Sequence, residues 1–148
     1  MKFDKSKKLL VIGRAGMDIY PEPPGTKISD VQEFSTHLGG SAANTCVALS
    51  KLGVSSDLVT CISDDAIGEY IFKKLEDFNV GSNLCRRVDK KFQTQVAVVE
   101  TILKNNQSIL YRNNSCDLQL DKEDIDKINY QDYSAVFISG TALSSSPS

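Results

Sequence analysis

The sequence predicts an α/β protein in which helices flank a central, mainly parallel sheet and a smaller sheet lies beside it. Along the 148 residues, short apolar runs typical of buried strands alternate with segments of helical spacing, which is the pattern of a parallel sheet. Residues 31–38 and 93–112 depart from this alternation, because both segments are strand-like without an intervening helix. We therefore expect these segments to form a separate small sheet.

The first third of the chain contains two predicted strands and a helix. Residues 9–12 form a short, continuous apolar strand. Three prolines and a glycine within residues 21–25 predict a turn without regular structure. A strand over 31–38 leads to a helix over 41–52, and Gly53 follows as a left-handed C-cap.

The remaining elements continue the alternation. A strand over 57–62 precedes a helix that starts at Asp64 or Asp65 and ends near residue 78, with apolar residues along one face. The predicted elements beyond it are a hairpin of strands 93–102 and 108–112, a short helix over 121–128 and a strand over 135–138.

Composition and charge exclude several classes of protein. The chain is 41% hydrophobic and 24% charged, which is ordinary for a globular domain, and its net charge of −2 gives no electrostatic reason to bind nucleic acid or an anionic membrane. No apolar run approaches the roughly 20 residues of a membrane helix, and the start lacks the pattern of a signal peptide. Four widely spaced cysteines predict buried thiols in a cytoplasmic protein and no metal site.

Polar and glycine-rich segments follow the ends of several predicted strands, where α/β proteins place their ligands. In residues 39–44 (GGSAAN), Gly39 and Gly40 let the backbone approach a ligand, the helix start offers free N–H donors, and Asn44 adds a donor and an acceptor. A plain strand–helix turn capped by Asn44 explains the same residues. An incomplete glycine pattern at 13–16 and the absence of GxxxxGK[ST] exclude a dinucleotide fold and a P-loop.

Residues 39–53 (GGSAANTCVALSKLG) resemble the first signature of the ribokinase (PfkB) family of carbohydrate kinases. Residues 61–71 (CISDDAIGEYI) are similar to the strand and the Asp-x-x-Gly turn that follow it in that family. The resemblance runs along essentially the whole chain and departs at Cys46, where a smaller residue is usual, and at Ser63, where glycine is usual. It implies a ribokinase-like fold in which residues 1–148 form the N-terminal part of one kinase domain.

The resemblance also implies roles for particular residues. Asp18 would grip sugar hydroxyls together with Gly39, Gly40 and Asn44, and segments of about 19–38 and 92–112 would form a β-sheet lid. A solvated turn is the alternative reading of Asp18.

Three segments resemble more closely a family member that phosphorylates a sugar acid: residues 12–18, 111–120 and 139–148. Arg112 matches the substrate arginine of such kinases, Arg14 is a second candidate to bind the carboxylate, and Tyr111 would close the sugar pocket. The alternatives are structural ion pairs for both arginines and packing within a strand for Tyr111.

The C-terminal half of the family fold is absent from this sequence, and with it the Gly-Ala-Gly-Asp motif that carries the catalytic base. The resemblance therefore implies no catalytic residue within this chain and a base located beyond Ser148. In the family, ATP binds along that C-terminal half. The chain ends just after a strand-like run, which indicates an interrupted fold.

We therefore expect a sugar-binding half that is inactive alone, from a parent that uses ATP and Mg²⁺. A homodimer formed through the lid is compatible with this arrangement. The alternatives are a kinase of another sugar or nucleoside and a non-catalytic sugar-binding or interaction fragment.

Overall fold

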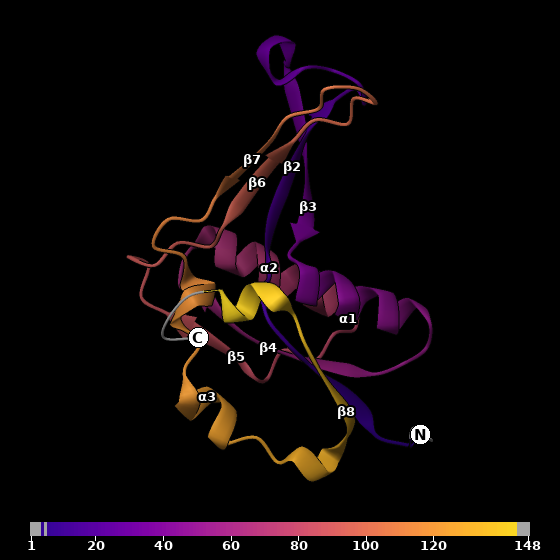
Figure 1. Cartoon of the computed structure of the whole chain (residues 1–148), viewed down its shortest axis with the longest axis vertical. Helices are drawn as coiled ribbons and strands as arrows, with labels where there is room; N and C mark the ends of the chain where they lie inside the picture. The colour runs from indigo at the N-terminus through magenta and orange to yellow at the C-terminus, as the bar shows by residue number, and fades with distance from the viewer. Residues whose placement is uncertain (1–3, 5, 145–148) are drawn as a thin grey trace.

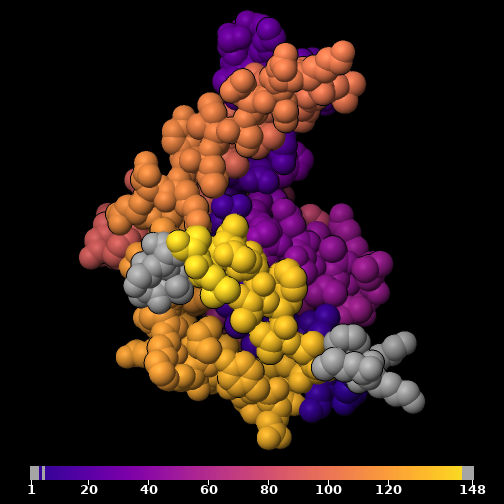
Figure 2. All heavy atoms as spheres, in the orientation of Figure 1, coloured from indigo at the N-terminus to yellow at the C-terminus, as the bar shows by residue number. Residues whose placement is uncertain are grey.

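Two four-stranded sheets organise the chain in the computed structural model, which describes residue 4 and residues 6–144 (Figure 1). The strand order is β5-β4-β1-β8 in the first sheet and β3-β2-β6-β7 in the second. Figure 2 shows the second sheet as an arm that projects from the body formed by the first sheet and its helices. The expected main sheet and small sheet are both confirmed.

The first sheet is parallel throughout. Its strands are β1 (Lys8–Ile12), β4 (Ser56–Ser63), β5 (Cys85–Val88) and β8 (Tyr133–Ile138). Three of them match the predicted apolar runs. No apolar pattern predicts β5, because two of its four residues are arginines. The sheet tolerates these arginines because β5 is an edge strand.

Two helices cover one face of the first sheet, α1 (Ser41–Lys51) and α2 (Ala66–Asp77). Their buried residues pack on Val11 and on Leu58 and Ile62 of β4. Gly53 ends α1 with a φ of 76°, and the Asp65 carboxylate caps α2 by accepting from the N–H of Gly68. The predicted helices and both of their caps are confirmed.

The opposite face is covered by the short helix α3 (Lys122–Asp126) and the 3-10 helix η2 (Cys116–Gln119). Leu10 and Ile12, which alternate with Val11 along β1, pack here against Cys116 and Leu120. Three further 3-10 helices are η1 (Ile28–Asp30), η3 (Tyr130–Asp132) and η4 (Gly140–Leu143).

The second sheet consists of β2 (Gly16–Glu22), β3 (Glu33–Gly39), β6 (Val96–Val99) and β7 (Ser108–Tyr111). The pairs β2–β3 and β6–β7 are antiparallel, and β2–β6 is parallel. The expected irregular turn over 21–25 was partly wrong, because Pro21 and Glu22 belong to β2. Pro21 is tolerated because it lies beyond the residues of β2 that pair with β6, where only β3 is a neighbour.

Strand β8 leaves apolar side chains on the surface. Val136, Phe137 and Ile138 are 45–49% exposed, and the yellow C-terminal segment crosses the visible face in Figure 2. Because β8 is an edge strand, one side of its backbone is also open to a further strand.

Only residues 139–144 of the segment 139–148, which carried part of the resemblance, lie within the described residues. Ser148 lies outside the described residues, and the expectation of a catalytic base beyond Ser148 stays a prediction. Within the part of the chain that the structure describes, no helix combines the length and the apolar character needed to cross a membrane.

Candidate functional site

The loops that follow β1 and β8 meet the start of α1 at the carboxyl edge of the first sheet. The hydroxyl oxygens of Ser41 and Ser139 are 2.6 Å apart. A Cβ added at Gly13 would stand 2.7 Å from Cβ of Ser139 and 3.0 Å from Cβ of Ala42. The ends of β1 and β8 therefore converge on the start of α1, as the topology of a parallel sheet requires.

Gly40 joins the second sheet to α1 in a conformation that only glycine adopts easily. Its φ is 95°, and a Cβ here would stand 2.4 Å from the carbonyl oxygen of Arg14. That same carbonyl accepts a hydrogen bond from the N–H of Ala43 at 3.2 Å. The first turn of α1 is thus packed directly on the backbone of the loop that carries Arg14.

Asp18, on β2, lies against Gly39 at the end of β3. A Cβ at position 39 would stand 2.1 Å from Oδ1 of Asp18. The hydroxyl of Tyr20 donates to Oδ2 at 3.4 Å. Burial raises the pKa of Asp18 above its usual value, while the Tyr20 hydrogen bond and the charges of Arg14 and His37 oppose that rise. The result is a half-buried carboxylate at the base of the second sheet.

Asn44 lies one turn into α1, and its N–H donates to the carbonyl of Gly40 at 2.9 Å. Its side chain is exposed and makes no hydrogen bond to any residue that the structure describes. The structure thus brings Asp18, Gly39 and Gly40 to one corner of the molecule, and Asn44 follows on the adjoining helix.

The two candidate arginines differ in their partners. Arg112 donates to Oδ2 of the buried Asp117 from Nε (3.1 Å) and Nη2 (2.6 Å), and also to the carbonyl of Thr141 and the hydroxyl of Ser144. Arg14 is half-buried, and its Nε is enclosed without a hydrogen-bond partner among the described residues. Arg112 therefore ties the end of β7 to the segment after β8, whereas Arg14 has no such tie.

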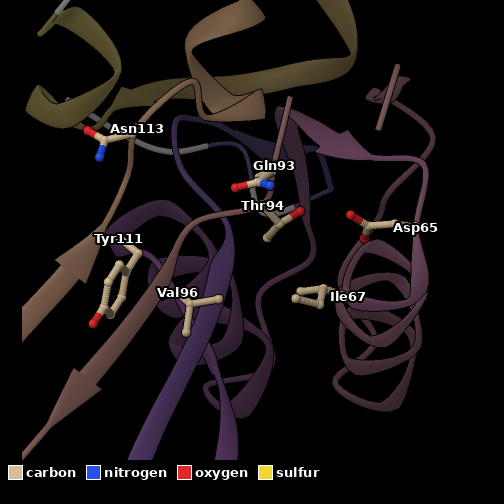
Figure 3. A pocket seen from close by; sticks show the side chains of 7 residues that line it. All are labelled: Asp65, Ile67, Gln93, Thr94, Val96, Tyr111 and Asn113. Atoms are coloured by element: carbon tan, nitrogen blue, oxygen red, sulfur yellow. The ribbon is translucent and has the colours of Figure 1, made fainter. Parts of the chain in front are cut away.

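Tyr111 is on β7, two strands away from Asp18 on β2 in the second sheet. It lines a pocket of about 410 Å³ between the β6–β7 hairpin and the start of α2 (Figure 3). The lining residues are Asp65, Ile67, Gln93, Thr94, Val96, Tyr111 and Asn113. Because Asp18, Gly39, Gly40 and Asn44 do not line this pocket, the structure does not place Tyr111 in one cavity with them.

A buried glutamine that the sequence analysis did not single out holds the loop between β1 and β2. The side chain of Gln95 donates from Nε2 to the carbonyl of Ala15 at 2.5 Å. The backbone carbonyl of Gln95 accepts from the N–H of Met17 at 3.1 Å. A Cβ at Gly16 would stand 2.0 Å from Gln95 Nε2. No sequence signal marked Gln95, because it lies in a segment whose alternating pattern indicated only a strand.

Comparison with known proteins places this geometry among sugar kinases. The chain is 34% identical over 145 residues to a 5-dehydro-2-deoxygluconokinase of Photobacterium profundum, covering 98% of this chain and 44% of that protein. It is 31% identical over 150 residues to one from Listeria innocua, covering 99% and 44%. The chain thus spans less than half the length of these relatives.

Solved structures give the same result for the fold. A sugar kinase from Pyrococcus horikoshii in complex with ATP superposes with a TM-score of 0.80 at 27% identity, covering 94% of this chain and 45% of that one. A 2-dehydro-3-deoxygluconokinase from Thermotoga maritima gives a TM-score of 0.81 at 20% identity, covering 90% and 41%, and shares the fold. Residues 6–148 match the family model described as pfkB family carbohydrate kinase, and the chain belongs to that family.

Proposed function

We propose that this chain is the sugar-binding part of an ATP-dependent kinase whose acceptor is a sugar acid resembling 5-dehydro-2-deoxygluconate. The observation that carries the proposal is the half-buried carboxylate of Asp18 beside Gly39 and the glycine-led start of α1. The names of the relatives in Photobacterium profundum and Listeria innocua support the choice of acceptor.

Each candidate residue then has a distinct task. The Asp18 carboxylate accepts hydrogen bonds from sugar hydroxyls, and Asn44 can both donate and accept at the start of α1. Gly39 leaves room for the Asp18 carboxylate and Gly40 leaves room for the Arg14 backbone, so the groups proposed to meet the sugar pack closely together. Tyr111 would close the site from the hairpin. Arg14 and Arg112 are the two candidates to bind the carboxylate of the acid.

Phosphoryl transfer needs more than these residues supply. The reaction depends on positioning and on charge stabilisation around the transferred group. Among the described residues, no group of three or more His, Cys, Asp and Glu side chains is arranged to hold a metal ion. In this proposal the catalytic base, ATP and Mg²⁺ belong to the part of an intact kinase beyond Ser148, and the isolated chain is expected to be inactive.

The second sheet would act as the lid over the sugar, with a second copy of the chain as a partner. Exposed apolar residues on the second sheet support contact with a second copy, since Phe34, Ile109 and Leu110 are more than two-fifths exposed.

We also propose a cytoplasmic location. Cys46, Cys61 and Cys116 are buried and free of disulfides. Burial raises the pKa of the Cys61 thiol to about 12, as expected of an unreactive structural thiol. Such thiols suit a reducing compartment, in which disulfides are rare.

An acceptor panel tests the function. An intact kinase containing this chain is assayed with ATP against the sugar acid, its neutral analogue, fructose and a nucleoside, and the 148-residue chain is assayed alone. We expect the highest kcat/KM for the acid and no turnover by the chain alone. A higher kcat/KM for fructose or the nucleoside would assign a different class of acceptor. If no sugar were phosphorylated, the proposed kinase function would be excluded.

A further inference from the structure

We infer that Arg14, and not Arg112, is the residue that binds the carboxylate of the acid substrate and so determines specificity for acids. The inference rests on the proposed function. It follows from the different states of the two guanidinium groups, which the sequence alone presents as equivalent candidates.

Arg112 has little hydrogen-bonding capacity left. Its guanidinium makes four hydrogen bonds, two of them to Asp117, and an arginine side chain has five N–H donors. One free N–H cannot form the two-bond fork by which arginine recognises a carboxylate.

Releasing Arg112 would also be costly, because the Asp117 side chain is only 3% exposed. Its one other side-chain partner among the described residues is the hydroxyl of Ser115. A buried carboxylate that loses its charged partner is strongly unfavourable. Arg112 is thus a structural residue that holds β7 against the segment after β8.

Arg14 is in the opposite state. Its Nε is enclosed without a partner, and no described residue forms an ion pair or a side-chain hydrogen bond with its guanidinium. Buried N–H groups are nearly always paired, so an unpaired one calls for an explanation. A bound carboxylate supplies it, because two parallel N–H···O bonds from the guanidinium would use the unsatisfied capacity.

The surroundings of Arg14 fit an acid that also carries hydroxyls. Its backbone is held by the first turn of α1 through the N–H of Ala43, beside Gly40. Its positive charge acts on the carboxylate of Asp18, yet the two do not form an ion pair. One unpaired cation and one half-buried carboxylate close to each other complement a sugar acid, whose carboxylate would meet Arg14 and whose hydroxyls would meet Asp18.

The test compares Arg14→Gln with Arg112→Gln in the intact kinase. Each variant is assayed with the sugar acid and with an analogue whose carboxylate is replaced by a hydroxymethyl group, and its melting temperature is measured. For Arg14→Gln we expect the ratio of kcat/KM for acid over analogue to fall by about 30–150-fold, the usual effect of losing a charge-assisted fork, with an unchanged melting temperature.

For Arg112→Gln we expect a lower melting temperature and similar losses on both substrates, so the ratio stays within about threefold. Changing Asp117→Asn in the same protein should recover part of the melting temperature, because the buried charge is removed. A ratio that falls in Arg112→Gln, or that stays constant in Arg14→Gln, overturns the assignment. Failure of the proposed function would instead appear in the unmodified kinase, as an equal or better reaction with the neutral analogue.

Discussion

The carboxylate of Asp18, on β2, lies against Gly39 of the neighbouring strand β3 and occupies the space that a side chain at Gly39 would fill. Asp18 is paired with His37, so Gly39 is its diagonal neighbour two residues along. With a Cβ at position 39 only 2.1 Å from Oδ1, any other residue would displace the carboxylate. The first glycine of the pair thus determines where the Asp18 carboxylate can lie, and the second makes room for the loop that carries Arg14.

Gly39→Ala tests that relationship. The methyl group should push the Asp18 carboxylate aside, and a displacement of about 1 Å in a positioning group costs up to roughly 100-fold in rate. We expect kcat/KM for the sugar to fall by about 10–100-fold in the intact kinase, with ATP affinity unchanged. Gly140→Ala is the matched control, because a Cβ there meets no atom within 4 Å. Equal kinetics for the two variants would contradict the role of Gly39.

Asp18→Asn keeps the shape of the side chain but turns one acceptor oxygen into a donor. A sugar hydroxyl would then face an N–H, and such a mismatch costs about 1–3 kcal/mol, or roughly 5–150-fold in kcat/KM. Affinity for ATP should be unchanged. The exposed Asp64→Asn serves as a control for the loss of a negative charge. A lower melting temperature of Asp18→Asn with normal turnover would show that Asp18 has a structural role. A loss of ATP affinity would show that Asp18 contributes to the nucleotide site and not to the sugar site.

The pH dependence of kcat/KM should report the raised pKa of Asp18. Only the ionised carboxylate accepts two hydroxyls, so activity falls as pH drops through the pKa of Asp18, which burial raises. The same shift makes protonated Asp18 favourable in the folded state, so its contribution to stability is greatest at low pH and declines as pH rises through the folded pKa. The measurement uses the neutral analogue, which does not titrate. If kcat/KM of Asp18→Asn still falls at low pH in the same way, the fall belongs to another titrating group.

Asp124 should contribute to stability at neutral pH. Burial by itself raises the pKa of Asp124, but hydrogen bonds from Arg86, from the N–H of Asp121 and from Lys127 outweigh it and lower the pKa to about 2. A group whose pKa is lower in the folded state than in the unfolded state stabilises the fold at pH values above its unfolded pKa. This stabilisation is lost as the pH falls from about 4 to about 2. Asp124→Asn should therefore cost about 2–3 kcal/mol at pH 7 and much less near pH 2.

The check is the melting temperature of the intact kinase and of this variant across that pH range. The exposed Asp126→Asn on the same short helix is the control. A difference between Asp124→Asn and the unmodified protein that is the same at every pH would contradict the assigned pKa.

The isolated chain should associate with itself through β8. Val136, Phe137 and Ile138 expose an apolar surface on an edge strand, which favours pairing or aggregation. Phe137→Lys should shift the sedimentation profile toward monomer. Leu52→Lys removes a single exposed leucine at the end of α1 and should not. A monodisperse monomer of the unmodified chain would contradict this prediction.

Most secondary structure could be predicted because its signals are local. The apolar runs of β1 and β4, the Asp65 cap and the left-handed Gly53 each depend on neighbouring residues. β5 and β2 were not predicted as strands. A polar strand at a sheet edge, and a strand whose Pro21 lies beyond the residues paired with β6, are stable only through their partners.

The sequence by itself determined the alternation of strands and helices, the glycine pair before α1 and the residues that could meet a sugar. Only the tertiary structure decided which of those residues are available to a ligand. Arg112 is paired with Asp117 and contacts Thr141 and Ser144, which are distant in sequence, whereas Arg14 has no such partner among the described residues. The hydrogen bonds of Arg112 to Thr141 and Ser144 depend on how the strands and loops are brought together, and no local pattern of residues encodes such contacts.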